Sequence, residues 1–233
     1  MPRPDPRNYL ETWALCKECQ AEDGWGAAVY GEESLCLTHA LRDHLLSEKA
    51  VVAHPILDAR GCELMPDDLA RSLDLVSGSG KALAFDGAFF PVNVAMAEMA
   101  FPSKVSFNHA VFEGGVSFTA STFEGPVSFH KTLIAGSIGF GHAQCLAQAD
   151  FRQLVVGGTA WFDSSQFFAE ANFSRAHLGG LAIFDGSRFY LRLPEFFGAQ
   201  ISSLDLDPDF AFVGWHSRPS ADVQGVSPLP DLP

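Results

Sequence analysis

The sequence lacks the segments that carry a chain across or into a membrane. No run approaches the roughly 18 consecutive apolar residues of a membrane-spanning helix. The first residues, MPRPDPRNYLETW, do not follow the basic-then-apolar order of a signal peptide. Cysteine is scarce, and all but one of the cysteines lie between Cys16 and Cys62, which does not suit a disulfide framework. These absences predict a soluble, cytoplasmic protein.

Basic residues are also few. The chain of 233 residues has 15 Lys and Arg against 28 Asp and Glu, a formal net charge of −13. This balance excludes binding of nucleic acid through a general basic surface. Hydrophobic residues make up 47% of the chain, which is enough to form a core and excludes disorder throughout. The length suits one elongated domain or two small ones.

Phenylalanine is absent before Phe85 and abundant afterwards, because 19 of the 21 lie between Phe85 and Phe197. From Leu83 to Arg192 the chain divides without a gap into ten rows of eleven residues. Columns three and eight hold twenty residues, and all are apolar. Fifteen are Phe, and the others are Met96, Ile134, Cys145, Val156 and Leu178. This regularity indicates a structural repeat and not merely a Phe-rich composition.

The apolar columns favour strands over helices. Columns one, three, six and eight are apolar or small, and residues two apart share a face of a strand but not of a helix. An eleven-residue period is also typical of a right-handed helical coiled coil. Frequent Gly and the dominance of aromatic and β-branched residues argue against that alternative. Cys145 stands in an inward column and is predicted to be a small buried filler.

Each row resembles two repeats of the pentapeptide-repeat protein family with one residue added, as in Ala171-Asn172-Phe173-Ser174-Arg175. The resemblance implies a mainly β fold, the right-handed quadrilateral β-helix of that family, with four short sides per coil. Two rows would make one coil, so ten rows would make five coils, about 24 Å tall at the usual strand spacing. The Phe columns would then face inward, with the small residues of columns one and six at the corners.

The N-terminal segment contains two knuckle-like pairs, Cys16-x2-Cys19 and Cys36-x2-His39. Cys and His side chains in this pattern are typical ligands of a tetrahedral Zn²⁺, and four protein ligands make a structural site. We therefore predict that these four residues bind structural zinc, the alternative being unrelated thiols. Cys62 and His44 are spare candidates without a paired spacing.

Helices are expected around this zinc module. Ser34 to Glu48 has apolar residues at helical spacing, and Pro66 opens a second candidate helix; both would cover the first coil. The Cys/His pairs, Asp58-Ala-Arg-Gly61 and a Leu-rich helix before Phe repeats resemble an N-terminal module of some bacterial pentapeptide-repeat proteins. Ser77–Lys81 is predicted to be a linker, because it lacks the first Gly and the final Ser or Thr of a phosphate-binding loop.

We expect three regions: a zinc module at 1–82, a β-helix at 83–203, and a C-terminal cap with a Pro-rich tail at 204–233. The repeat fades after Arg192, because Glu195 falls where Phe belongs. Residues 193–215 are predicted to cover the open end or to form a homodimer contact. The aromatic residues expected there are Phe196, Phe197, Phe210, Phe212 and Trp215.

The repeat offers little support for catalysis. Residues two rows apart would stack on adjacent coils, which pairs Asp163 with Asp185 and aligns Asn108, His130 and Arg152. Two stacked carboxylates are able to act as acid and base, but a solvated polar face is the favoured interpretation. Other histidines on outward columns, His109, His142 and His177, lack a metal-ligand spacing. We predict no catalytic residue, no cofactor-binding residue and no enzymatic activity.

The leading functional hypothesis is a scaffold that docks a protein partner of unknown identity, with no direct binding of nucleic acid or membrane. The resemblance also suggests an alternative, an acidic DNA mimic that occupies gyrase, as quinolone-resistance pentapeptide proteins do. Residues 83–203 carry only 9 acidic against 6 basic residues, whereas residues 1–82 carry 14 against 8, so the acidity lies mainly outside the repeats. A third hypothesis is an enzyme with its site where the module meets the column.

Overall fold

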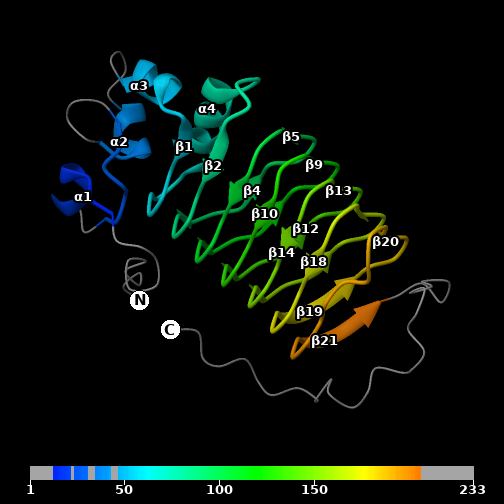
Figure 1. Cartoon of the computed structure of the whole chain (residues 1–233). Helices are drawn as coiled ribbons and strands as arrows, with labels where there is room; N and C mark the ends of the chain where they lie inside the picture. The colour runs from blue at the N-terminus through cyan, green and yellow to red at the C-terminus, as the bar shows by residue number, and fades with distance from the viewer. Residues whose placement is uncertain (1–12, 22–23, 31–34, 43–46, 206–233) are drawn as a thin grey trace.

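The computed structural model describes residues 13–21, 24–30, 35–42 and 47–205. They form a column of stacked coils with short helices gathered at its N-terminal end (Figure 1). The fold is mainly β, as predicted, and its named strands pair in parallel. No helix in the described part of the chain is long and apolar enough to span a membrane.

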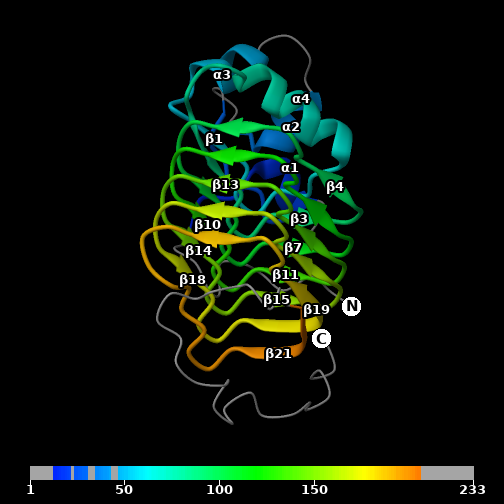
Figure 2. The same ribbon diagram turned by 90° about the vertical axis from the view of Figure 1, so that its right-hand side faces the viewer.

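The strands stand on four sides of the column, and most are very short. On the first side lie β1 (Ile56–Asp58), β2 (Ala82–Ala84), β6 (Val105–Ser106), β10 (Val127–Ser128), β14 (Ala149–Asp150) and β18 (Ala171–Asn172). On the second side lie β3 (Phe89–Phe90), β7 (Val111–Phe112), β11 (Leu133–Ile134) and β15 (Val155–Val156), stacked in Figure 2. On the third side lie β4 (Val94–Ala95), β8 (Val116–Ser117), β12 (Ile138–Gly139) and β16 (Ala160–Trp161). On the fourth side lie β5 (Ala100–Phe101), β9 (Thr122–Phe123), β13 (Gln144–Cys145), β17 (Gln166–Phe167) and β20 (Arg188–Phe189).

The register confirms that two rows make one coil. Val127 of β10 pairs with Val105 on one neighbour and with Ala149 on the other, and each of these partners lies two rows away in the sequence. The longer strand β19 (His177–Ile183) runs through the corner between the second and third sides, because it pairs with both β15 and β16. The four-sided β-helix implied by the resemblance to pentapeptide repeats is therefore present.

A left-handed residue occupies column five of every row. This position has a positive φ at Gly87 and Gly186 and at eight residues that are not glycine. The eight are Glu98, His109, Ala120, Lys131, His142, Gln153, Ser164 and Arg175, with φ between 52° and 58°. The conformation turns the chain between two sides of a coil. The sequence does not reveal it, because eight of the ten residues lack the glycine that usually marks such a turn.

Aromatic ladders fill the interior, as the columns predict. Stacked phenylalanines follow one another on successive coils, with ring centroids 4.9 Å apart for Phe107 and Phe129 and 4.6 Å apart for Phe151 and Phe173. Neighbouring ladders meet edge to face, as Phe118 and Phe129 do at 5.5 Å. All five of these rings are fully buried. Offset-stacked and edge-to-face contacts are the favourable geometries for aromatic pairs, so the rings stabilise the column beyond their buried area.

Hydroxyl groups in column six are buried and hydrogen-bonded. Ser121 Oγ donates to the carbonyl of Met96 at 2.7 Å, and Thr132 Oγ1 donates to the carbonyl of Phe107 at 2.6 Å. Each bond joins one coil to the coil before it, so these polar groups fit the core without an unmet hydrogen bond. Cys145 is 1% exposed in its inward column, and burial raises the pKa of its thiol. Its predicted place as a buried filler is confirmed.

Four helices lie at the N-terminal end of the described column, where α3 and α4 cross its upper end in Figure 2. They are α1 (Lys17–Ala21), α2 (Leu37–Arg42), α3 (Ser47–Ala53) and α4 (Pro66–Val76). The helix predicted to begin at Pro66 is confirmed. The helix predicted for residues 34–48 begins later than predicted, at Leu37, and helical structure continues past residue 48 to Ala53 in α3; residues 43–46 lie outside the described ranges.

The column extends beyond the ten rows at its N-terminal end. β1 pairs with β2 in register, Ile56 opposite Ala82, and Glu63 pairs with Phe89. In this first coil, β1 lies on the first side and Glu63 on the second. α4, which follows Glu63 and precedes β2, takes the place of the third and fourth sides. The distance along the chain from Ile56 to Ala82 is longer than two rows, so the eleven-residue pattern does not detect this coil.

The column also continues past Arg192. Glu195 pairs with Asn172, and Phe196 stacks on Phe173 at 4.9 Å, so one added residue restores the inward position to Phe. The last strand of the described chain, β21 (Gln200–Asp205), pairs with β19. Residues 193–205 therefore form a further partial coil where a cover or dimer contact was predicted. Phe210, Phe212 and Trp215 lie outside the described residues.

Candidate metal centre

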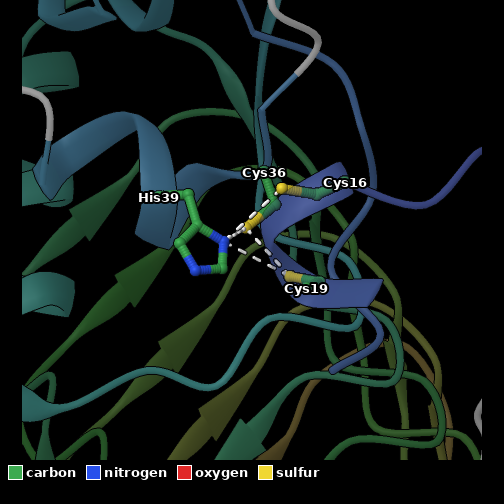
Figure 3. A group of neighbouring side chains, drawn as sticks. All are labelled: Cys16, Cys19, Cys36 and His39. Atoms are coloured by element: carbon green, nitrogen blue, oxygen red, sulfur yellow. Dashed lines mark hydrogen bonds between the residues drawn. The ribbon is translucent and has the colours of Figure 1, made fainter. Parts of the chain in front are cut away.

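The two knuckle pairs meet in a buried cluster. Cys16 directly precedes α1 and Cys19 lies within it, whereas Cys36 directly precedes α2 and His39 lies within that helix. The three cysteines are at most 6% exposed, and His39 is 9% exposed. Figure 3 shows the Nδ1 atom of His39 directed toward the three sulfurs. Among the described residues these are the ones whose His, Cys or carboxylate atoms gather closely enough, within 4.8 Å, for a metal ion.

The distances fit one tetrahedral ion. His39 Nδ1 lies 3.4 Å from Cys16 Sγ, 3.4 Å from Cys19 Sγ and 3.2 Å from Cys36 Sγ. Cys19 Sγ and Cys36 Sγ are 3.5 Å apart. An ion held at about 2.3 Å from sulfur and about 2.0 Å from nitrogen would keep sulfur and nitrogen roughly 3.6 Å apart. The four side chains are therefore placed to hold a metal ion with little movement.

Gly26 shapes the space above the sulfurs. A Cβ atom at this position would lie 2.6 Å from the Cβ of Cys36 and 2.9 Å from Cys19 Sγ, so no side chain fits. The amide of Cys16 donates to the carbonyl of Gly26 at 3.0 Å, which brings the turn back over the first knuckle. Sequence reasoning did not identify Gly26 as part of the site. The available signal was its place in Gly24-Trp25-Gly26, shortly after the first cysteine pair.

Hydrogen bonds distribute the charge among the thiols. The pKa of Cys19 is lowered to about 6, first because Cys36 donates a hydrogen bond to it and also because Gly26 N–H and His39 lie nearby. The pKa of Cys36 is raised because its proton is shared with Cys19 and Cys62. A metal ion binds thiolates, so a site that already lowers one thiol pKa favours its binding.

Cys62 lies beside the cluster without belonging to it. It is 1% exposed, and a hydrogen bond from Cys36 together with the amides of Thr38 and Leu37 lowers its pKa. Its sulfur is absent from the group of four atoms gathered around one point. The other spare candidate, His44, lies outside the described residues.

Polar and aromatic contacts join this module to the first coil. The Asp58 carboxylate is 1% exposed and accepts hydrogen bonds from the backbone amide and the guanidinium of Arg60, the shortest being 2.9 Å from Nε and 2.6 Å from Nη2. The amide of Asp58 donates to the Tyr30 hydroxyl at 2.5 Å, and the Arg60 guanidinium lies 5.5 Å from the centre of the Trp13 ring. Thr38 Oγ1 donates to the carbonyl of Glu63. The Asp58-Ala-Arg-Gly61 segment is thus the structural joint between module and column.

The outward polar residues of the repeat form pairs within the surface. Ser164 N–H donates to the carbonyl of Asp185, so Asp163 and Asp185 lie on adjacent coils as predicted. The Asp163 carboxylate faces His142 Nε2 at 4.0 Å, and Arg152 turns to Asp150 at 2.7 Å.

Two of the outward histidines pack against each other. The rings of His109 and His130 meet edge to face at 6.1 Å. Burial lowers the pKa of both, to about 4 for His109, with the positive charge of Lys131 adding to the effect. Both rings are therefore neutral at pH 7.

Comparison with known families agrees with this architecture. Residues 107–155, in the centre of the column, match the family model described as pentapeptide repeats, in nine copies. No curated protein and no solved structure shows a significant match to the chain. The matched residues begin directly after β6 and extend to the first residue of β15, within the four-sided column. The parallel solenoid and the aromatic ladders of the column thus contain, at residues 107–155, the repeats that this family model describes.

Proposed function

We propose that the protein is a non-enzymatic scaffold whose β-helix sides dock a protein partner. The observation that carries the proposal is the contrast between the inward and the outward positions of the eleven-residue rows. Inward columns three and eight are apolar in all ten rows, whereas columns two, four and seven vary from row to row among charged, polar, aromatic, aliphatic and small residues. A rigid frame that displays a varied surface suits recognition of an extended partner.

Zinc is the metal we propose for the four-residue cluster. Three thiolates and one imidazole are its usual structural ligands, and four protein ligands leave no open position for a substrate. When bound, the ion supplies folding stability to a short segment that has few other sources of it. Metal analysis of the purified chain is expected to give one zinc per molecule.

Site-specific cross-linking tests the scaffold proposal. A photoreactive amino acid is placed at one exposed position near each of the four sides: Arg152, Glu113, Ala95 and Ala100. The zinc-loaded full chain is then illuminated in native lysate. We expect the same protein to cross-link from one side or from two adjacent sides and to bind the unmodified chain after purification. Weak cross-links from all four positions, with no protein in common, would contradict the proposal.

The DNA-mimic alternative is tested in a supercoiling assay. Acidic residues of the column are partly neutralised, since Asp150 pairs with Arg152 and Glu170 with Arg192. We therefore expect no inhibition of gyrase at low micromolar protein. Inhibition or quinolone protection at that concentration would favour mimicry over the scaffold.

A homodimer through the C-terminal end is also proposed. β21 is the last strand of the described column, and one of its edges pairs with β19. Sedimentation of the full chain over a range of concentrations tests this, and a monomer at all concentrations would exclude it.

A further inference from the structure

The third side of the column contains a notch where one coil lacks outward side chains. In the row that begins at Ile138, columns two and four are both glycine, Gly139 and Gly141. In the coils that pair with this row, the same columns carry Ser117 and Thr119 on one neighbour, and Trp161 and Asp163 on the other. The result is an open groove of about 650 Å³, on the side that carries β4 and β12 in Figure 1.

The walls of the groove combine an aromatic face with a carboxylate. Trp161 is 45% exposed, and the side chain of Asp163 is 35% exposed. Asp185, at column four of its row like Asp163, is exposed on the next coil. On the opposite wall, the hydroxyls of Ser117 and Thr119 are 3.0 Å apart.

The negative charge of Asp163 in the groove has no lysine or arginine beside it among the described residues that line the groove. The nearest counter-group to the Asp163 carboxylate within the described part of the chain is the His142 imidazole at 4.0 Å. Other acidic residues differ in this respect, since Asp150 lies 2.7 Å from Arg152. An indole beside a carboxylate whose described counter-group is only an imidazole attracts a cation by both the ring face and the charge.

We propose that this groove binds an arginine or lysine side chain carried by an extended segment of a partner protein. Alternate side chains of an extended segment point to the same face, so one basic side chain enters the notch while its neighbours lie over the wall. The inference deepens the proposed scaffold function and rests on it. It differs from mimicry of DNA because it depends on Trp161 and the notch and not on the net charge of the chain.

The backbone does not require glycine at the floor of the notch. Gly139 has no positive φ, and the equivalent position carries Ser117 and Trp161 on neighbouring coils. A Cβ atom there would lie 3.3 Å from the hydroxyls of Ser117 and Thr119, so these two side chains would have to shift by a few tenths of an ångström. At Gly141, by contrast, a Cβ atom would lie 2.9 Å from the Asp163 carboxylate. Substitution of Gly139 therefore fills the notch without removing a charge.

The test is a titration followed by NMR amide shifts of the zinc-loaded full chain. The probe is a five-residue peptide of glycine and serine with a central arginine, and the matched probe has neutral citrulline in its place. We expect the arginine peptide to shift the amides of Gly139 and Gly141 and the indole of Trp161. The citrulline peptide is expected to bind about two- to fivefold more weakly, the usual effect of one exposed charge pair or cation–π contact.

Variants separate the groove from general electrostatic attraction. Trp161→Ala, Asp163→Asn and Gly139→Gln are each expected to weaken binding of the arginine peptide about two- to fivefold. Glu124→Gln is the matched control, because it removes one exposed negative charge on another part of the column. It is expected to leave binding unchanged. Circular dichroism confirms that every variant is folded.

Three results would overturn the proposal. Equal binding of the arginine and citrulline peptides would exclude recognition of a cation. Equal weakening by Glu124→Gln and Asp163→Asn would mean that only the net charge attracts the peptide. Binding of a cello-oligosaccharide that depends on Trp161, without binding of the arginine peptide, would make the groove a sugar site. In each case a partner cross-linked from another side would leave the scaffold function intact.

Discussion

At the scale of single residues, the left-handed position of column five carries an energetic cost that the column tolerates. Eight of the ten residues there are not glycine and have φ between 52° and 58°. This conformation places the Cβ atom too close to the following carbonyl, at a cost of about 1–2 kcal/mol per residue. Strain at the left-handed positions therefore offsets part of the stability that the packed core provides. Replacement of a residue at these corners by glycine is therefore expected to relieve strain.

Replacement of Ala120 by glycine is expected to stabilise the protein. Ala120 is exposed and has φ of 56°, so Ala120→Gly relieves strain without removing a buried contact. We expect a gain of about 0.5–1 kcal/mol in the free energy of unfolding, after the larger chain entropy of glycine is subtracted. Urea unfolding of the full chain measures it. Ala95→Gly, at an exposed position without a positive φ, is the control and is expected to destabilise the chain by about the same amount.

At the scale of elements, the aromatic ladders stabilise the column by packing, whereas the Cys/His knuckles are placed to stabilise their segment by binding a metal ion. The strands are too short to hold a sheet by themselves, so the stacked rings supply most of the stabilising contact between coils. Around the knuckles a few side chains such as Tyr30, Leu37 and Leu41 are buried, and we expect the segment to depend also on a metal ion held by the four gathered ligands. Truncation of a ring and removal of the metal should therefore affect different parts of the chain.

A central ring is expected to be essential to the column. Phe129 is fully buried and stacks between Phe107 and Phe151. Phe129→Ala should lower the free energy of unfolding by about 3–5 kcal/mol, because it leaves a cavity between rigid neighbours. Urea unfolding measures the loss. Phe197→Ala, at a ring that is 79% exposed, should change stability by less than about 0.5 kcal/mol. Equal losses in both variants would argue against the buried ladder.

The metal centre predicts opposite results for two buried cysteines. Cys36→Ser removes one of the four gathered ligands, so the purified chain should lose the proposed zinc ion and the NMR signals of the segment before α3 should collapse. Cys62→Ser leaves the four ligands in place and should retain one zinc per chain. Elemental analysis and amide spectra measure both variants. Zinc loss from Cys62→Ser with zinc retained by Cys36→Ser would assign the site to a different set of thiols.

At the scale of the whole molecule, the column is a series of nearly equivalent coils between two irregular ends. Each of the regular coils pairs with the coil above and the coil below it, through parallel partners two rows apart in the sequence. The first coil uses α4 for two of its sides, and the last contains one added residue before Phe196. Length can therefore change in the middle more easily than at either end.

Removal of one complete coil is expected to be tolerated. Deletion of residues 127–148 removes two complete rows and joins Pro126 to Ala149. Ala149 occupies the same row position as Val127, so the aromatic ladders above and below the deletion meet in register. We expect a folded chain with the same zinc content and a modestly lower melting temperature, because one interface between coils is lost. Deletion of residues 127–131 alone leaves a coil without one of its sides and should abolish cooperative melting. Circular dichroism during heating distinguishes the two.

Much of this structure was accessible from particular residues of the sequence. The columns of Phe predicted the interior rings, and the spacing of Cys16, Cys19, Cys36 and His39 predicted the cluster. The extra coil at Glu63 was missed because α4 interrupts the period, and the coil at Phe196 was missed because one residue is added. Gly26 was missed because its role depends on the approach of Cys36, which is distant in sequence.

By itself, the sequence determined which side chains face inward, because burial imposes the same requirement on every row. Two rows per coil were implied by the resemblance to pentapeptide repeats and are confirmed by the strand register. Only the tertiary structure decided what lies side by side on the outside, since that depends on how each coil is placed on the next. The left-handed corners, the joint at Asp58 and Arg60, and the notch at Gly139 all depend on the path that the folded chain takes from coil to coil. Local sequence patterns indicate which side chains are buried. The outer surface, on which recognition depends, forms only when one coil stacks on the next.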